Sequence, residues 1–200
     1  MLLFPVFGFD LPRSFNYGGI GSVIGHEITH GFDNSGKDFD ENGNMRRWLS
    51  EEWQKSFEER ATCFVEQYNN TPVLHYTGKK ALKTNLTNNG TYTLKENIAD
   101  YGGVQLALKA WRNRQSIYGS EPRFDAMQDF SNEQAFFIGY ATHWCGRLSL
   151  DLTMALLIAD VHSLYNIRVN NVLANIPEFA EAFHCAPGTR MNPGKRCSMY

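Results

Sequence analysis

One short stretch of this chain, Gly25-His26-Glu27-Ile28-Thr29-His30, limits its fold and chemistry more than any other. If residues 16–31 are helical, His26 and His30 lie four residues apart and project from one face, one turn apart. That spacing lets two imidazoles bind one metal ion, and it places Glu27 where it can reach a metal-bound water without being a ligand. The same pattern also occurs by chance on surface helices, so the rest of the chain has to decide.

The composition favours one globular unit over a nucleic-acid-binding or membrane protein. With 200 residues, of which 42% are hydrophobic and 14% aromatic, the chain can bury a substantial core, and its length suits one domain over residues 1–200. A net charge of −2 gives no basic surface, so nucleic acid is not an expected partner. The longest apolar stretch, residues 148–158, is shorter than the roughly 20 residues of a membrane span. The amino terminus lacks the basic region and cleavage site of a signal peptide.

Apolar residues recur at helical spacing along most of the chain, and strand signals are almost absent. Ser50 and Ser131 both resemble helix N-caps, so the sequence predicts a helix after each of them. Another helix is expected from Leu94 to Trp111, followed by a polar connection over residues 112–130. We therefore predict a mainly α fold.

Glycines in the first turns of the motif helix indicate a crowded site. Glycine weakens a helix by about 1 kcal/mol relative to alanine. Gly18, Gly19 and Gly21 therefore predict close approach by another backbone or by a ligand.

Two carboxylates on the second predicted helix, Glu96 and Asp100, lie four residues apart and face the same way. Burying such a pair is unfavourable unless a cation or a hydrogen-bond donor meets it. A zinc ion and the free ring nitrogen of a zinc-bound histidine would do both. Thr93 followed by Glu96 also fits a capping box, which is a purely structural alternative for Glu96.

The remaining candidates are ambiguous when each is read alone. His143 is predicted to be a core or boundary histidine, His162 a solvated loop histidine, and Arg168 an ordinary surface arginine.

Sequons and cysteines point to an exported protein. Three glycosylation sequons begin at Asn69, Asn85 and Asn89, in polar, turn-rich sequence. The four cysteines lack a Cys-x-x-Cys pair, which favours disulfides over a zinc knuckle, and the sequence leaves all three possible pairings open.

Together these motifs resemble the neprilysin and endothelin-converting enzyme family of zinc metallopeptidases, in the family's order and with similar spacing. The matching blocks span essentially the whole chain: Asn16–Gly21, Val23–Asp33, Glu96–Asp100, Trp144–Gly146, Asp160–Ser163 with Arg168, and Glu181–Cys185.

The resemblance assigns a role to each candidate. It implies that one Zn²⁺ per chain is bound by His26, His30 and Glu96, with the fourth position open to water. It makes Glu27 the general base and Asp100 the acceptor of a hydrogen bond from a ligand histidine, His26. His162 would stabilise the oxyanion and Arg168 would bind a substrate carbonyl. Val23 and Trp144 match positions that line the pocket for the residue after the cleaved bond.

The resemblance also implies the fold class and the activity. The expected fold is a zincin of the gluzincin, thermolysin-like type, and the expected activity is cleavage of oligopeptides on the amino side of hydrophobic residues. Family members are much longer, with a membrane span and a helical lobe that caps the active site. We therefore expect the carboxyl-terminal portion of a catalytic domain, lacking the upstream strands and the lobe, from an extracellular or cell-surface ectodomain. Any membrane attachment would come from a segment absent from this chain.

Two further expectations follow from those missing parts. Exposed apolar faces predict association, and a catalytically incompetent zinc-binding module, or a partner of a full-length relative, becomes the alternative function. The resemblance pairs Cys63 with Cys197 and leaves Cys145 and Cys185 without partners in this chain.

Overall fold

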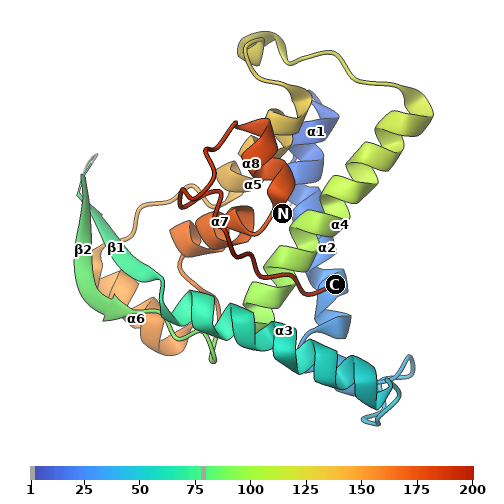
Figure 1. Ribbon diagram of the computed structural model, residues 1–200. Helices are drawn as coiled ribbons and strands as arrows, with labels where there is room; N and C mark the ends of the chain where they lie inside the picture. Colours follow the sequence, from blue (N-terminus) through green and yellow to red (C-terminus); the bar gives the residue numbers. More distant parts are fainter. Residues whose placement is uncertain (1–2, 78–79) are drawn as a thin grey trace.

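The computed structural model describes residues 3–77 and 80–200, and helices dominate them (Figure 1). This confirms the mainly α prediction. The α-helices and strands are, in chain order, α1 Arg13–Asn16, α2 Ser22–Thr29, α3 Glu51–Asn69, β1 Pro72–Thr77, β2 Lys80–Thr87, α4 Leu94–Tyr118, α5 Asn132–His143, α6 Leu150–Ala159, α7 Tyr165–Ala174 and α8 Pro177–Ala182.

The motif lies on a nearly continuous helical run that starts three residues before the predicted Asn16. The π-helical segment Tyr17–Gly21 joins α1 to α2, and the 3₁₀ turn His30–Phe32 follows α2. A Cβ atom on Gly18 would lie 1.8 Å from the carbonyl oxygen of Phe136, and one on Gly19 would lie 2.4 Å from that of Val6. The predicted close approach is thus confirmed at these two glycines. Gly21 has only ordinary contacts.

Helices α2 and α4 cross with their backbones touching, and Figure 1 shows them lying side by side. A Cβ atom on Gly25 would meet the carbonyl oxygen of Gly103 at 2.7 Å, and one on Gly103 would meet that of Ser22 at 2.6 Å. Only glycine permits this approach. It brings His26, beside Gly25, next to the first turns of α4.

Helix α3 also contributes aromatic side chains to the core. Ser50 caps it by accepting a hydrogen bond from the backbone N–H of Trp53 at 3.2 Å, as predicted. Phe57, Phe64 and Tyr68 are buried in one cluster with side chains of α4, α5 and α7. The Cys63–Cys197 disulfide ties the carboxyl-terminal segment to α3, which confirms the expected pairing. Cys145 and Cys185 form no disulfide within residues 3–77 and 80–200.

Two secondary-structure predictions are wrong. Strands β1 and β2 pair antiparallel as a hairpin where a sequon-bearing loop was expected. Most side chains of β2 are exposed, so this strand lacks the apolar alternation that marks a half-buried strand. Helix α4 also continues through residues 112–118, which were expected to be connection. Its last turns are largely solvent-exposed, so they lack the apolar stripe by which a sequence reveals a helix.

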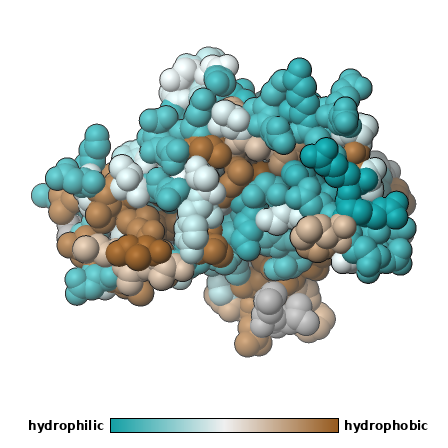
Figure 2. Space-filling model, turned by 90° about the horizontal axis from the view of Figure 1, so that it is seen from below, coloured by the Kyte–Doolittle hydropathy of each residue, from teal (hydrophilic) through white to brown (hydrophobic). Residues whose placement is uncertain are grey.

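Apolar side chains are exposed in several places. Figure 2 shows apolar patches at the lower edge of the face seen from below and at its left, the side where Figure 1 places the hairpin and α6. Exposed apolar residues of α6 are Leu150, Leu152, Met154 and Ile158. The predicted apolar surface is therefore present. Among the described residues, no helix is long and apolar enough to cross a membrane.

Candidate metal centre

Three side chains from two helical segments converge on one point. His26 Nε2 lies 3.0 Å from His30 Nε2, and Glu96 Oε2 lies 3.3 Å from each of these nitrogens. The two histidines project from adjacent turns of the motif helix, and Glu96 projects from the first turn of α4. The predicted spacing therefore does bring the histidine pair and the distant glutamate together.

Buried carboxylates fix which ring nitrogens of the histidines face that point. His26 Nδ1 donates to Asp100 Oδ1 at 2.8 Å, and His30 Nδ1 donates to Asp33 Oδ2 at 2.6 Å. Asp100 is 4% exposed and Asp33 is 2% exposed. Because each Nδ1 holds its proton for a carboxylate, each Nε2 is left with a lone pair directed at the other and at Glu96.

The donor set fits a zinc ion. Glu96 Oε2 is buried without a hydrogen-bond partner, because none of the nearby imidazole nitrogens is aligned to donate to it. Two neutral imidazole nitrogens and a carboxylate oxygen this close repel one another unless a proton or a metal cation lies between them. Ligands about 2.0–2.1 Å from a tetrahedral zinc are separated by roughly 3.3 Å, which matches the spacings found here. Burial by itself raises the pKa of Glu96, but neighbouring His162 and His26 lower it more, so the group stays ionised.

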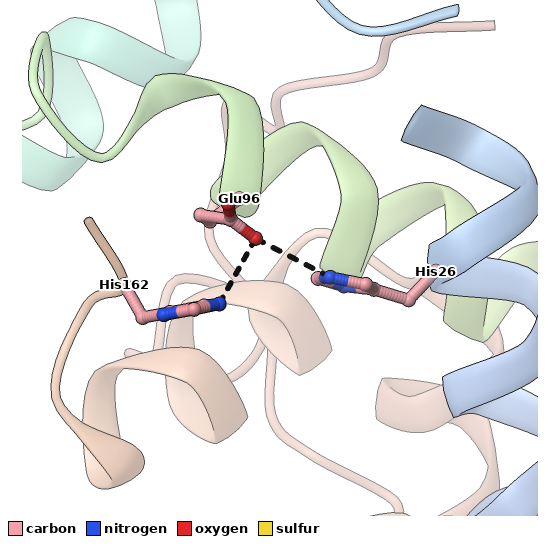
Figure 3. A group of neighbouring side chains, drawn as sticks. All are labelled: His26, Glu96 and His162. Atoms are coloured by element: carbon pink, nitrogen blue, oxygen red, sulfur yellow. Dashed lines mark ion pairs between the residues drawn. The ribbon is translucent and has the colours of Figure 1, made fainter. Parts of the chain in front are cut away.

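His162 approaches Glu96 from the other side. Figure 3 shows His26 and His162 flanking the carboxylate, and His162 Nε2 lies 3.1 Å from Glu96 Oε2. Its Nδ1 lies 2.7 Å from Asp160 Oδ1. The nearby Glu96 carboxylate raises the pKa of His162, while burial opposes the rise. His162 is therefore half-buried beside the metal ligands, which excludes its reading as a solvated loop histidine.

A buried polar network holds the His162 loop against α4. Ser163 Oγ donates to Asn97 Oδ1 at 2.8 Å, and Asn97 Nδ2 donates to Thr93 Oγ1 at 2.8 Å. Thr93 makes no side-chain cap to the helix, so the capping-box alternative for Glu96 is wrong. The Glu96 side chain is free to turn into the site.

Arg168 is a core residue, not a surface arginine. It is 7% exposed, and its Nε and Nη2 each donate to Asp100 at 2.7 Å. Its guanidinium also lies 3.8 Å from the centroid of the Trp144 ring. Asp100 therefore joins His26, 74 residues before it, to Arg168, 68 residues after it.

A cavity of about 160 Å³ opens beside these groups. Its lining includes Glu27, Val23, Trp144, Arg168 and His162, all singled out in the sequence, together with the unassigned His143. Glu27 is exposed, as a group that has to reach a water molecule must be. The fold therefore gathers all the predicted site residues around this cavity except His30 and Glu96, which lie within 3.3 Å of His26.

The sequence analysis missed two carboxylates that orient histidines. Asp33 follows His30 by three residues and Asp160 precedes His162 by two. Both spacings put a carboxylate within reach of the ring, and this local signal could have identified them.

Comparisons with known proteins agree with this geometry. The sequence model of Peptidase family M13 matches residues 1–199. Over 98% of its length the chain is 46% identical to neprilysin-1 of Caenorhabditis elegans and 39% identical to human neprilysin, and it spans 25% of each. The crystal structure of the Mycobacterium tuberculosis zinc metalloprotease Zmp1 in complex with inhibitor superposes with a TM-score of 0.86 at 31% identity, covering 98% of this chain and 29% of that one.

These findings confirm the resemblance and the fold class. The chain spans about a quarter of the length of its curated relatives, so it corresponds to one part of them. Zinc is the metal named for the matching Zmp1 structure, and the donor set described above suits it. By its sequence over nearly its whole length, and by its fold, the chain belongs to peptidase family M13.

Proposed function

We propose that residues 1–200 form the carboxyl-terminal portion of a peptidase catalytic domain that hydrolyses oligopeptides with one zinc ion. His26, His30 and Glu96 would hold the metal. The observation that carries the proposal is the convergence of their three lone-pair atoms within 3.0–3.3 Å, with the far ring nitrogens of both histidines held by buried carboxylates. A chance pair of surface histidines would have no such support.

His30, and not His162, is the third ligand in this proposal. The Nε2 atom of His30 lies within 3.3 Å of both other ligand atoms. His162 Nε2 lies 3.1 Å from Glu96 Oε2, but the ligand atoms of His26, Glu96 and His162 lie only within 4.8 Å of one another. His162 thus lies one step outside the ligand set, where its N–H can reach the carbonyl oxygen of a bound peptide.

The other residues divide the work of hydrolysis. A Zn²⁺ ion held by these three side chains would supply Lewis acidity and would lower the pKa of a coordinated water towards about 7. Glu27 takes the proton of the attacking water and returns it to the leaving amine. His162, whose pKa is raised, donates a hydrogen bond to the oxygen that becomes negatively charged. Asp100 occupies Nε and Nη2 of Arg168, which leaves Nη1 to bind a substrate carbonyl.

The cavity beside the metal site would receive the residue after the cleaved bond. Val23 and the Trp144 ring give it apolar walls, which favours cleavage on the amino side of hydrophobic residues. We also propose an extracellular or cell-surface setting with glycosylation, because Asn69, Asn85 and Asn89 are all exposed.

The second candidate is a zinc-binding module without activity, or a partner of a full-length relative. It is favoured by the exposed apolar residues of α6. Those apolar faces would then serve association.

Zinc content and peptide cleavage, measured on the same preparation, separate the two candidates. The peptidase requires one zinc per chain and chelator-sensitive cleavage of an internally quenched peptide with a hydrophobic residue after the scissile bond. The variant Glu27→Gln should keep its zinc and lose cleavage by a factor of about 10² or more. Bound zinc without cleavage would favour the module, and cleavage that survives Glu27→Gln would refute the assigned mechanism.

A further inference from the structure

His143 gives the substrate cavity a polar group that the proposed mechanism does not use. It is the last residue of α5, and its ring lines the cavity together with Val23, Trp144 and Arg168. The ring packs edge-on against Trp144, with 4.5 Å between the ring centroids. His143 therefore lies between the apolar Val23 and Trp144 side chains and the charged groups of the same cavity.

The surroundings of His143 determine which ring nitrogen carries the proton. Burial lowers the pKa of His143, and the nearby Arg168 lowers it further, so the ring is neutral at pH 7 and has a single proton. Nδ1 is buried without a hydrogen-bond partner. A buried N–H with no acceptor is less tolerable than a buried unpaired acceptor, so the proton resides on Nε2. With Nδ1 buried, the ring presents its Nε2 side to the cavity.

The charges around the cavity favour a neutral acceptor for that N–H. Asp100 already neutralises Arg168 through two hydrogen bonds. Glu27 lines the same cavity and forms no ion pair with any residue in the described ranges. An acidic substrate side chain would therefore face the Glu27 carboxylate without gaining a free cation.

We propose that His143 makes the site prefer tyrosine as the residue on the carboxyl side of the cleaved bond. More generally, it favours uncharged side chains that have an apolar body and a terminal oxygen atom. The phenol ring would lie between Val23 and the Trp144 ring, and its oxygen would accept a hydrogen bond from His143 Nε2. This inference rests on the proposed function for the location of the substrate residue. His143 is then a specificity residue and takes no part in bond cleavage.

Paired substrates and paired variants test the proposal. Two quenched peptides that differ only in Tyr or Phe after the cleaved bond are compared by kcat/KM. One neutral hydrogen bond predicts a preference for Tyr of about fivefold in the natural chain. His143→Leu removes the donor and should abolish the preference, whereas His143→Gln keeps an N–H donor and should retain part of it. A Tyr/Phe ratio near one in the natural chain, or an unchanged ratio in His143→Leu, overturns the proposal.

A binding measurement separates this proposal from the proposed function. The amides of Tyr-Ala and Phe-Ala, which mimic the cleavage product, are titrated calorimetrically into the zinc-loaded natural chain and into both variants. Preferential binding of Tyr-Ala that is lost in His143→Leu supports the role of His143 even if no peptide is hydrolysed. Equal binding of the two dipeptides, or no binding of either, overturns it even if hydrolysis is found.

Discussion

Replacing Asp33 with asparagine should weaken zinc binding by moving the ring proton of His30 from Nδ1 to Nε2. Asp33 Oδ1 accepts hydrogen bonds from the backbone N–H groups of Ser35 and Gly36, both at 2.7 Å, while Oδ2 accepts from His30 Nδ1. An asparagine has only one oxygen. If that oxygen stays with the two backbone donors, the amide NH₂ faces His30 Nδ1 and donates to it. The imidazole proton must then move to Nε2, the atom that faces His26 and Glu96.

The opposite amide orientation is more costly. It would place the NH₂ group against the partly buried backbone N–H donors of Ser35 and Gly36, and each donor left unsatisfied costs up to about 1–3 kcal/mol. The tautomer change costs less, because loss of such a carboxylate partner typically reduces metal affinity by about 10- to 100-fold, or roughly 1.4–2.7 kcal/mol. We therefore expect Asp33→Asn to raise the zinc dissociation constant by that factor.

A competition titration against a chromophoric chelator at pH 7.5 measures this change. Asp38→Asn is the matched control, because Asp38 is an exposed carboxylate in the same loop that pairs only with Lys37 in the described chain. The melting temperature of each metal-free variant reports on the fold. A dissociation constant within twofold of the natural chain would refute the tautomer argument, and equal losses in both variants would assign the effect to the loop.

Three further predictions follow from the same contacts. His30→Ala should abolish stoichiometric zinc binding, whereas His162→Ala should keep the zinc and lose about 10²- to 10³-fold in kcat; the reverse pattern by elemental analysis would make His162 the ligand. Burial by itself lowers the pKa of His26, but the neighbouring Asp100 and Glu96 carboxylates raise it to about 9 without a metal. Zinc must displace that proton, so the affinity for zinc should rise about tenfold per pH unit up to pH 9. In the metal-free chain, the same proton should contribute its full stabilisation below about pH 6.5, and that stabilisation should be lost as the pH rises from there to 9. Removing the Cys63–Cys197 disulfide, which spans 134 residues, should lower the free energy of unfolding by about 2–5 kcal/mol in urea denaturation, and an unchanged midpoint would show that the tail needs no covalent tie.

The sequence predicts best those parts of the site that lie within one helix. The spacing of His26 and His30 is fixed by helical geometry, and so is that of Glu96 and Asp100. The unfavourable burial of two carboxylates already indicated a cation or donor partner. For Asp100 the structure shows both: the donor is the His26 ring and the cation is the Arg168 guanidinium. Local periodicity and elementary electrostatics were sufficient here.

Contacts between distant segments leave no such local trace. Arg168 was read as a surface residue because nothing near it in sequence reveals Asp100, 68 residues earlier. The capping-box reading of Glu96 failed for a related reason. Thr93 could have capped α4, but it bonds instead to Asn97, which in turn holds the His162 loop through Ser163. When local and tertiary hydrogen bonds compete for one side chain, sequence spacing alone cannot decide between them.

The relative position of the two helices that carry the proposed ligands depends on glycines, which have no Cβ atom. At the crossing of α2 and α4, Gly25 and Gly103 let the two backbones touch, and a single Cβ atom on either would lie within 2.7 Å of a carbonyl oxygen. His26 is adjacent to this contact and Asp100 is one helical turn away, so any separation of the helices would stretch the 2.8 Å bond between them. Periodicity describes the side chains that are present and predicts which face of a helix is buried. How closely two helices approach depends on positions without a side chain. A glycine inside a helix can therefore fix the position of a neighbouring ligand residue, although it makes no contact with the metal itself.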